Sequence, residues 1–548
     1  MSSTILPHSQ TQATATSGDK ADIEMAEYTG THGAVDEVKA GNVVPPSDFV
    51  NLNRLQTLRK FWKVTLFAFM VSFGATLDGF HQTIPGNIIA NPGFIQQFGT
   101  VVGANGQLAL DALHVSAWGG VLSGGNIFGN ILGGFTADLF GRKFNMFLMT
   151  LLLMLATICE MVATEWRVWL ASKLFAGIGN GFAQTALVIY NSEIAPPQIR
   201  GFLLSTWAFF YALGQLTASI GLQILATSSH PNDYKNSIYS EWVFTGIFLI
   251  FLVFLPESPW YHVRNRNHDK AKASLRTLYG NVEGYDVEHE YATFLSEVEF
   301  SERLRDEQKQ AKWSEIFTGI NGRRFMITAA IPLYGQLVGG SLIFTYLTYF
   351  FQLAGLENPF LASLIVFILL LAFIAVSFYT TDLVGRRPLL LGAIVVVVIC
   401  LLGVGIAGSV PETPSSKNAL IALACIWVVA YASGIAPCGS IYQGEASAPR
   451  LRAKTNSLSQ ALGQSFGLIF NYTVPIMLSP QQANWGVKTG YFFAGTAFLG
   501  GIILYFQMPE FKGRSYAELD ELFQKKVPAR KFRTTKTSHQ LLAQGTEV

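Results

Sequence analysis

The chain has 548 residues, of which 50% are hydrophobic, 14% are charged and 51 are glycine, and its formal net charge is +2. Soluble domains carry about 25% charged residues, so this composition excludes an ordinary soluble protein and favours one that crosses the lipid bilayer many times. The small net charge, without a basic tract, argues against nucleic acid as a partner. The four cysteines have neither disulfide nor metal spacing and are typical of packing residues.

Residues 1–51 are polar and lack the apolar core of a signal peptide, so they predict a disordered cytoplasmic tail. A membrane span needs about 20 apolar residues to cross roughly 30 Å of hydrocarbon. The first half, 52–257, and the second half, 324–508, each hold six such runs. They lie at 62–84, 115–137, 144–163, 167–190, 202–226 and 241–257, and at 324–350, 360–381, 388–409, 419–442, 456–478 and 487–508.

The charged segment 258–323 joins the halves and predicts a small cytoplasmic bundle of helices, while 509–548 forms a cytoplasmic tail. Most Lys and Arg residues of the short loops fall on one side of the predicted spans, and the opposite loop at 85–114 has none. By the positive-inside rule, both termini are cytoplasmic.

The sixth apolar run is unusually short. Val243 to Leu255 gives about 13 residues free of charge and proline, or roughly 20 Å of helix. The run is too short to span unless Asn236–Trp242 extends it. A second explanation is an error in the gene model that has removed several residues near Ser240–Phe244.

One loop signature occurs in both halves, as Asp138–Lys143 and again, 382 − 138 = 244 residues later, as Asp382–Arg387. An acidic residue and an arginine follow each copy at the next loop on the same side. Positive-inside topology explains arginines in such loops, but the repeated acidic partners favour a charged gate that latches the cytoplasmic ends of the helices. The predicted gate residues are Asp138, Arg142, Glu193 and Arg200, then Asp382, Arg386, Glu445 and Arg452.

The chain resembles the sugar porter family of the major facilitator superfamily over about 60–525. The resemblance lies in both loop signatures and in the segments 192–201, 256–260, 382–390, 444–452 and 509–514. Segment 447–455, together with 256–261, is most similar to the fungal α-glucoside and lactose permease branch. The resemblance implies an all-α membrane fold of twelve helices, with a substrate site at the midplane between two six-helix halves.

The chain departs from the pattern of the sugar porter family in the first helix and in the fourth. Sugar porters usually carry an aspartate in the first helix, paired with an arginine of the fourth helix and thought to couple proton and sugar binding. This chain has His81 and Lys173 at those positions. Asp78 lies one helical turn before His81, so we expect Asp78, with His81 or Lys173, to form a displaced proton site. The alternatives are a water-facing Asp78 at a helix end and facilitation without protons.

Sugar recognition uses amides and hydroxyls for the sugar OH groups and aromatic rings for the ring face. Aligned with the family, the surviving substrate-binding candidates are Gln215, Gln336, Ser341, Thr345, Tyr346 and Gln464, although each could also serve helix packing. Several hexose contacts are missing, which favours a disaccharide or other glycoside as the small-molecule substrate.

The sequence therefore predicts a plasma-membrane sugar transporter that works by alternating access, with protons as the expected coupling ion. Two alternatives stay open: export of a non-sugar small molecule such as a secondary metabolite, and a sugar sensor that moves no cargo. The sequence offers no nucleophile–base arrangement and no phosphate-binding loop, so we expect no enzyme activity, no cofactor and no metal.

Overall fold

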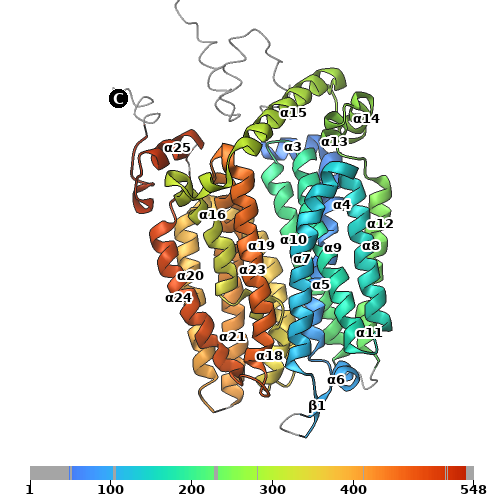
Figure 1. Ribbon diagram of the computed structural model, residues 1–548, viewed down its shortest axis with the longest axis vertical. Helices are drawn as coiled ribbons and strands as arrows, with labels where there is room; N and C mark the ends of the chain where they lie inside the picture. The colour runs from blue at the N-terminus through green and yellow to red at the C-terminus, as the bar shows by residue number, and fades with distance from the viewer. Residues whose placement is uncertain are drawn as a thin grey trace, which may run out of the picture.

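The computed structural model describes residues 49, 52–102, 106–226, 232–280, 282–411, 413–512, 514 and 516–537. The predicted N-terminal tail lies outside these residues apart from Phe49, as does the end of the predicted C-terminal tail, 538–548. Figure 1 shows two bundles of helices that stand side by side with their axes along the long direction of the molecule.

The helices of the N-terminal bundle begin and end close to the predicted boundaries. They are α3 (Arg54–Lys60), α4 (Trp62–Phe73), α5 (Ala75–Ile88), α7 (Ala112–Phe140), α8 (Arg142–Val162), α9 (Trp166–Ile194), α10 (Arg200–Leu225), α11 (Tyr234–Tyr239) and α12 (Glu241–Phe254). Gly74 keeps helical backbone angles, so α4 and α5 form one 27-residue span. The next loop carries α6 (Pro92–Phe98) and a hairpin of β1 (Val101–Val102) and β2 (Leu108–Ala109).

The sixth span is longer than its apolar run. Ser240 joins α11 to α12 with helical angles, φ −60° and ψ −22°. The joined helix, Tyr234–Phe254, has 21 residues, which gives about 31 Å at roughly 1.5 Å per residue. The helix does extend through Asn236–Trp242, the condition that the short apolar run set for spanning, and this extension places Glu241 inside the span.

The C-terminal bundle repeats this plan with two irregular spans. Its elements are α16 (Gly319–Leu337), α17 (Gly340–Phe344), α18 (Leu347–Leu353), α19 (Pro359–Val384), α20 (Arg386–Ala407), α21 (Pro414–Ala430), η2 (Tyr431–Ile435), α22 (Ala436–Ala446), η3 (Pro449–Leu451), α23 (Arg452–Leu478), η4 (Gly486–Lys488) and α24 (Thr489–Gln507). The seventh span breaks after α16, where Gly339 takes the left-handed φ of 84°. The tenth passes through η2, a π-helical turn of a kind often found at functional sites.

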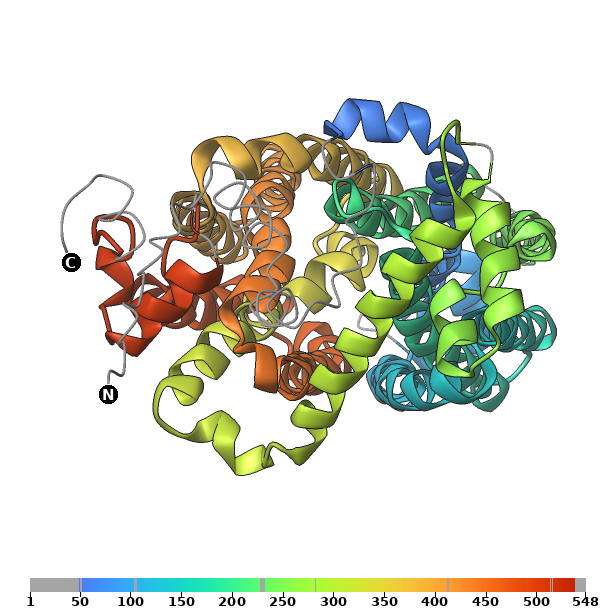
Figure 2. The same ribbon diagram turned by 90° about the horizontal axis from the view of Figure 1, so that it is seen from above.

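Shorter helices gather at one end of the bundles. The linker forms α13 (Pro259–Arg264), α14 (His268–Tyr279), α15 (Val287–Gln310) and η1 (Trp313–Phe317), and the C-terminal segment forms α25 (Tyr516–Gln524) and η5 (Ala529–Lys531). In Figure 2 the yellow-green helix α15 crosses this end of the molecule from the N-terminal bundle to the C-terminal one. Both loop signatures lie at the same end, which we call the loop-signature face.

Nine helical stretches of the described residues are long and apolar enough to cross a membrane. The remaining spans, α7, α9 and the broken α16–α18, are richer in glycine and polar residues because neighbouring helices cover them. A side-chain carbon added at Gly129 of α7, for example, would lie only 2.2 Å from the carbonyl oxygen of Ile178 on α9. The predicted all-α fold of two six-helix halves is confirmed.

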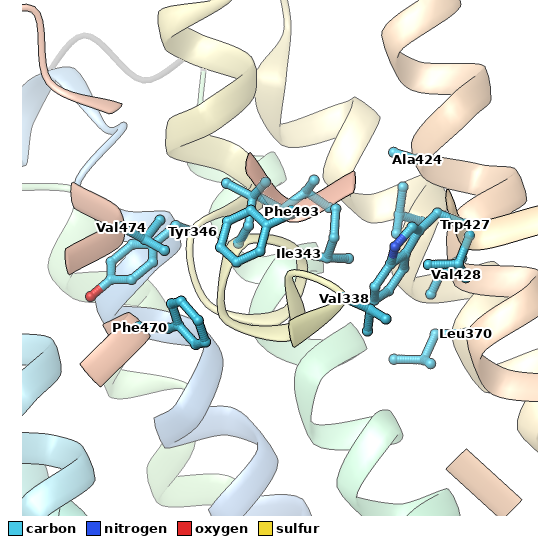
Figure 3. Packing of buried hydrophobic residues seen from close by; sticks show 14 of the residues in the cluster. Val338, Ile343, Tyr346, Leu370, Ala424, Trp427, Val428, Phe470, Val474 and Phe493 are labelled. Carbon is cyan, nitrogen blue, oxygen red and sulfur yellow. The ribbon is translucent and has the colours of Figure 1, made fainter. Parts of the chain in front are cut away.

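The C-terminal bundle has a continuous apolar core around the break in the seventh span. Figure 3 shows Trp427 of α21 beside Val338 and Leu370, and Tyr346 beside Phe470. Trp427 is 1% exposed and Tyr346 is 1% exposed. This packing holds the two broken ends of the seventh span in fixed positions near the other bundle.

Candidate functional site

Four ionisable side chains meet inside the N-terminal bundle, and each is at most 1% exposed. His81 Nε2 on α5 lies 2.5 Å from Glu241 Oε1 on α12. Lys173 Nζ on α9 lies 2.5 Å from Glu160 Oε1 on α8, and His81 Nδ1 lies 3.8 Å from the same carboxylate oxygen. We call these four residues the buried quartet.

The buried quartet holds two cations and two anions when His81 is protonated. A buried charge without a partner costs several kcal/mol, so each member depends on the others. Thr157 Oγ1 donates a hydrogen bond to Glu241 Oε2 at 3.1 Å, and Lys173 Nζ lies 4.2 Å over the ring of Trp169. Loss of the His81 proton would leave one unbalanced negative charge, so the net charge of the quartet depends on the protonation of His81.

Sequence reasoning missed Glu160 and Glu241. They lie at the ends of the predicted third and sixth spans, where a carboxylate ordinarily faces water. One sequence feature could have identified them: each is an ionisable residue beside an apolar run, at the end opposite to the loop signatures. The extension of the sixth span by α11 moves Glu241 from a helix end into the bundle interior.

Asp78 of α5 is completely buried and has a separate set of neighbours. Gln184 Nε2 of α9 donates to Asp78 Oδ2 at 3.3 Å. Asn130 Nδ2 of α7 donates to Gln184 Oε1 at 3.3 Å and to Asn126 Oδ1 at 2.6 Å. Asp78 Oδ1 has no hydrogen-bond partner among the described residues. A chain of three amides therefore leads from α7 to Oδ2 of the Asp78 carboxylate, while its Oδ1 can still accept a hydrogen bond.

The three predicted proton-site residues thus fall into two groups. Lys173 and His81 share the carboxylate of Glu160. Asp78 lies one turn earlier on the same helix as His81, but its hydrogen bond goes to Gln184. Helix α5 is the element common to both groups.

Three of the predicted substrate residues lie near the break in the seventh span. Ser341 Oγ of α17 donates to Gln336 Oε1 of α16 at 3.5 Å. A carbon added at Gly467 of α23 would lie 3.4 Å from Gln336 Nε2, and Gln464 is one turn away on the same helix. Gln215 belongs to the other bundle, on α10, where it is 1% exposed and its Nε2 has no partner among the described residues.

Thr345 and Tyr346, also predicted for the substrate site, lie in a tight contact between the bundles. Tyr346 Oη donates to the carbonyl of Asn471 at 2.8 Å, and Asn471 Nδ2 donates to Ser123 Oγ of α7 at 2.7 Å. A side-chain carbon at Gly86 of α5 would lie 1.7 Å from the carbonyl oxygen of Thr345.

Two more hydrogen bonds cross between the bundles beside this contact. Asn87 Oδ1 accepts from the backbone N–H of Thr348 at 3.3 Å, and Gln352 Nε2 donates to the carbonyl of Ala90 at 3.2 Å. These contacts close the molecule at the end opposite to the loop-signature face, and we call them the seam.

Each bundle also contributes one stacked Trp–Tyr pair at i, i+4. Trp207 and Tyr211 of α10 stack at 5.2 Å, and Trp427 and Tyr431 stack at 5.1 Å with an interplanar angle of 7°. Phe344 of α17 packs edge-on against Tyr431 at 5.0 Å. Helix α10 packs against α19 of the other bundle, so the Trp207–Tyr211 pair belongs to a helix at the boundary between the bundles.

The first loop signature forms a tight charged cluster. Gly141 has φ 102°, and Arg142 binds Glu193 with Nε at 3.0 Å from both carboxylate oxygens and Nη2 at 2.6 Å from Oε1. Glu257 accepts the backbone N–H groups of Arg142 and Lys143 at 3.1 Å. Burial raises the pKa of Glu257 above its usual value, although these N–H groups and Arg142 favour its charged form.

The second signature is built in the same way. Gly385 has φ 103°, and Glu510 accepts the backbone N–H groups of Arg386 and Arg387 at 3.1 Å each. Arg386 Nη2 lies 3.9 Å from Glu445. The side chain of Asp382 lies outside the described part of the structure, and Arg452 begins α23. Glu257 and Glu510, which hold the turns, were missed as site residues because they lie far along the chain.

The charged gate residues bind within one half and to the linker. Asp138 accepts from Arg264 of α13 at 2.7 Å and from Arg305 of α15 at 2.5 Å, and lies 3.7 Å from Arg142. Arg200 is an electrostatic neighbour of Glu297 on α15. The first loop signature therefore fastens the linker helices α13 and α15 to the ends of the N-terminal spans.

The model of the family described as "Sugar (and other) transporter" matches residues 67–523. The chain is 26% identical over 495 residues to the MFS transporter fmqE of Aspergillus fumigatus, covering 89% of this chain and 91% of that protein. It is 27% identical over 531 residues to the general α-glucoside permease of Saccharomyces cerevisiae, covering 93% and 84%.

Solved structures show the same fold. The inward-open xylose transporter XylE from E. coli has a TM-score of 0.68 at 20% identity, over 84% of this chain and 99% of that one. A second structure of that transporter, described as a proton:xylose symporter bound to 6-bromo-6-deoxy-D-glucose, has a TM-score of 0.65 at 21% identity.

Proposed function

The chain belongs to the sugar (and other) transporter family of the major facilitator superfamily, and on that premise we propose that it carries an α-glucoside or another glycoside through the membrane by alternating access. The relatives are transporters rather than enzymes, and one of them is named for α-glucosides. Like them it is a multi-pass membrane protein. The family match over 67–523 is the observation that carries this proposal.

Uptake into the cell is favoured over export and over sensing. The match to the α-glucoside permease covers 84% of that protein, and its name states a substrate class, whereas the name of the relative fmqE states none. Both bundles and the seam between them are intact in the described residues, as a transporting protein requires. Export of a non-sugar compound and signalling without flux are the outcomes that would replace this proposal.

We propose the substrate site between the bundles, with Gln215 on one side and Gln336, Ser341 and Gln464 on the other. The unpaired Nε2 of Gln215 is a free donor for a sugar hydroxyl. Thr345 and Tyr346 would reach the substrate only after the seam opens, because their described contacts are with the other bundle and with α23. The stacked Trp–Tyr pairs supply flat surfaces for a sugar ring.

For proton coupling we propose the buried quartet, with Asp78 as the second proton acceptor on α5. Protonation of His81 balances the quartet, and its loss leaves a net negative charge that favours rearrangement or entry of water. The Lys173–Glu160 contact at 2.5 Å fixes the Glu160 carboxylate beside His81. Asp78 Oδ1 offers the nearest unpaired carboxylate oxygen on the same helix.

We further propose that the loop-signature face is cytoplasmic and that the protein resides in the plasma membrane. The positive-inside rule supports the orientation, since the arginines of both signatures lie at this face. Closure of the seam at the opposite end would leave the substrate site open to the cytoplasm. We propose the same division of the chain as the sequence predicts, into halves at 52–257 and 324–508. In the proposed orientation, the linker 258–323 and the tail 509–548 lie on the cytoplasmic side.

Uptake of labelled maltose, lactose and glucose in transporter-null yeast cells tests the function, with surface expression measured in the same cells. We expect uptake of a disaccharide that a protonophore abolishes. Uptake that continues in the presence of the protonophore would show that the protein transports its substrate without proton coupling. No uptake from a protein present at the surface would refute sugar import and leave export or sensing.

A further inference from the structure

The C-terminal segment after α24 folds back onto the C-terminal bundle. Its apolar side chains are buried, with Leu522, Phe523 and Phe532 at most 1% exposed. Asp520 of α25 forms an ion pair with Arg324 at the start of α16, and the Arg324 guanidinium lies 4.5 Å over the ring of Phe523. Residues 516–537 therefore form a folded cap on the loop-signature face, which we call the C-terminal cap.

Internal hydrogen bonds fix the last turn of this cap. Arg514 Nη2 donates to the carbonyls of Phe532 and Thr535 at 2.9 Å and 2.7 Å. Arg514 Nη1 lies 3.3 Å from Glu518, whose Oε1 also accepts from Thr537 Oγ1 at 2.7 Å. The hydrogen bonds of Arg514 and Glu518 on the inner side of the cap thus support its conformation.

The outer side of the C-terminal cap carries an uninterrupted run of positive charge. No acidic residue occurs between Glu521 and Glu547. The run holds six cations, all exposed: Lys525, Lys526, Arg530, Lys531, Arg533 and Lys536. Lys525 pairs with Glu521 at 2.5 Å. We call these six residues the basic strip.

Contacts with the end of α24 determine the level of the basic strip relative to the membrane surface. The Arg530 guanidinium lies 4.5 Å over the ring of Tyr505 and 4.4 Å over that of Phe506. These rings are 46% and 60% exposed in the last turn of a membrane span, where aromatic side chains mark the membrane–water boundary. Arg530 is therefore held at the level of the lipid headgroups.

We propose that the basic strip is a binding surface for anionic phospholipid headgroups of the adjacent leaflet. Clusters of four to eight cations directly beside a membrane span attract such lipids, at about 1 kcal/mol or fivefold in affinity for each Lys or Arg near the surface. Positive-inside topology alone requires neither a folded cap nor an arginine stacked at headgroup depth. The inference rests on the cytoplasmic orientation proposed above, and is independent of the transported substrate.

The cap also links this surface to the seventh span. Arg324 lies in the first turns of α16, and Asp520 and Phe523 of the cap hold its guanidinium. Lipid bound at the strip would therefore stabilise the cap against the seventh span, in which Gln336 and Ser341 lie on either side of the break. Through this contact, a lipid bound at the strip would affect the position of α16 and so the proposed substrate site.

The test uses the purified full-length protein in neutral detergent and measures binding of dioctanoyl phosphatidylserine by native mass spectrometry. The strip variant is K531Q/R533Q/K536Q, and the matched control is K270Q/R276Q/K312Q, which removes three exposed cations from the linker. We expect the strip variant to bind about a hundredfold more weakly and the control to bind like the unmodified protein. Added salt should weaken the binding.

Two further measurements separate the possible outcomes. Thermal unfolding without lipid should be unchanged in the strip variant, because the three side chains are exposed; if it is not, the single variant K531Q is compared, with a loss of about fivefold expected. Equal phosphatidylserine binding by strip and control variants would overturn the proposal. Inorganic phosphate that displaces the lipid at equal concentration would also overturn it, since the strip would then be a general anion site.

Discussion

Replacing Glu241 by glutamine keeps the shape of the side chain but removes one of the two anions of the buried quartet. The His81–Glu241 contact at 2.5 Å then loses its charge, and His81 can respond by releasing its proton. Histidine in water loses its proton near pH 6.5, so a neutral imidazole at pH 7 costs less than about 1 kcal/mol. With the lost ion pair replaced by a neutral hydrogen bond, we expect a total destabilisation of about 1–2 kcal/mol.

The same substitution at Glu160 should be far more costly. Lys173 would lose the carboxylate at 2.5 Å, and within the described residues it has no other carboxylate inside 4.0 Å. Lysine in water loses its proton near pH 10.4, so neutralising it at pH 7 costs about 4.6 kcal/mol, while leaving it charged and unpaired costs about 3–5 kcal/mol. Glu160→Gln should therefore destabilise the protein by about 1–4 kcal/mol more than Glu241→Gln.

Thermal unfolding of the purified variants at pH 7 measures the difference, with the exposed Glu165→Gln as the matched control. Glu241→Gln should also lose accumulation of substrate against a gradient while retaining downhill equilibration, because His81 no longer carries a proton through the cycle. Equal destabilisation by the Glu241 and Glu160 substitutions would refute the charge argument. Accumulation that persists in a Glu241→Gln protein would refute the assignment of the coupling proton.

Three other substitutions test the seam and the loop clusters. Gly86→Ala places a carbon 1.7 Å from the opposing carbonyl and should reduce uptake about tenfold, whereas Gly134→Ala, which meets nothing within 4 Å, should not; equal uptake would contradict a closing seam. Because burial raises the pKa of Glu257 above 4.5, its protonated form favours folding, and that stabilisation is lost as pH rises through its folded-state pKa. Glu257→Gln should therefore flatten the decline in stability above about pH 4.5, as measured by thermal unfolding across pH. Asp138→Asn should release the linker and speed its proteolysis relative to the exposed control Asp269→Asn; identical cleavage would exclude a fastening role.

The spans could be predicted because each is a run of apolar residues bounded by charges or proline, and this pattern is local. The extension of the sixth span was also accessible, since a bilayer sets a minimum length that the run Val243–Leu255 does not reach. The break at Gly339 was not predicted, because glycines inside an apolar run are common in membrane helices and only the φ of Gly339 reveals the bend.

The site was only partly predictable, for a physical reason. His81 and Lys173 stood out because they replace residues expected from the family resemblance, but a substitution does not say which groups will neutralise the new charges. Glu160 and Glu241 approach them from α8 and α12, so the pairing depends on how four helices pack. Asp78 was recognised as an ionisable residue in a span, yet its partner Gln184 comes from a helix about a hundred residues away.

The positions on α5 suggest how proton binding and seam closure are connected. Within ten residues this helix carries Asp78, His81 of the buried quartet, and Gly86 and Asn87 of the seam. Pro85 lies between the quartet and the seam, where it removes one backbone hydrogen bond and allows the helix to bend. A change in the charge of His81 alters the electrostatic force between α5 and α12. His81 lies only five residues from Gly86, where an added side-chain carbon would clash with the carbonyl oxygen of Thr345. Proton release and opening of the seam therefore act within one and a half turns of the same helix, and their connection requires no longer pathway through the bundle.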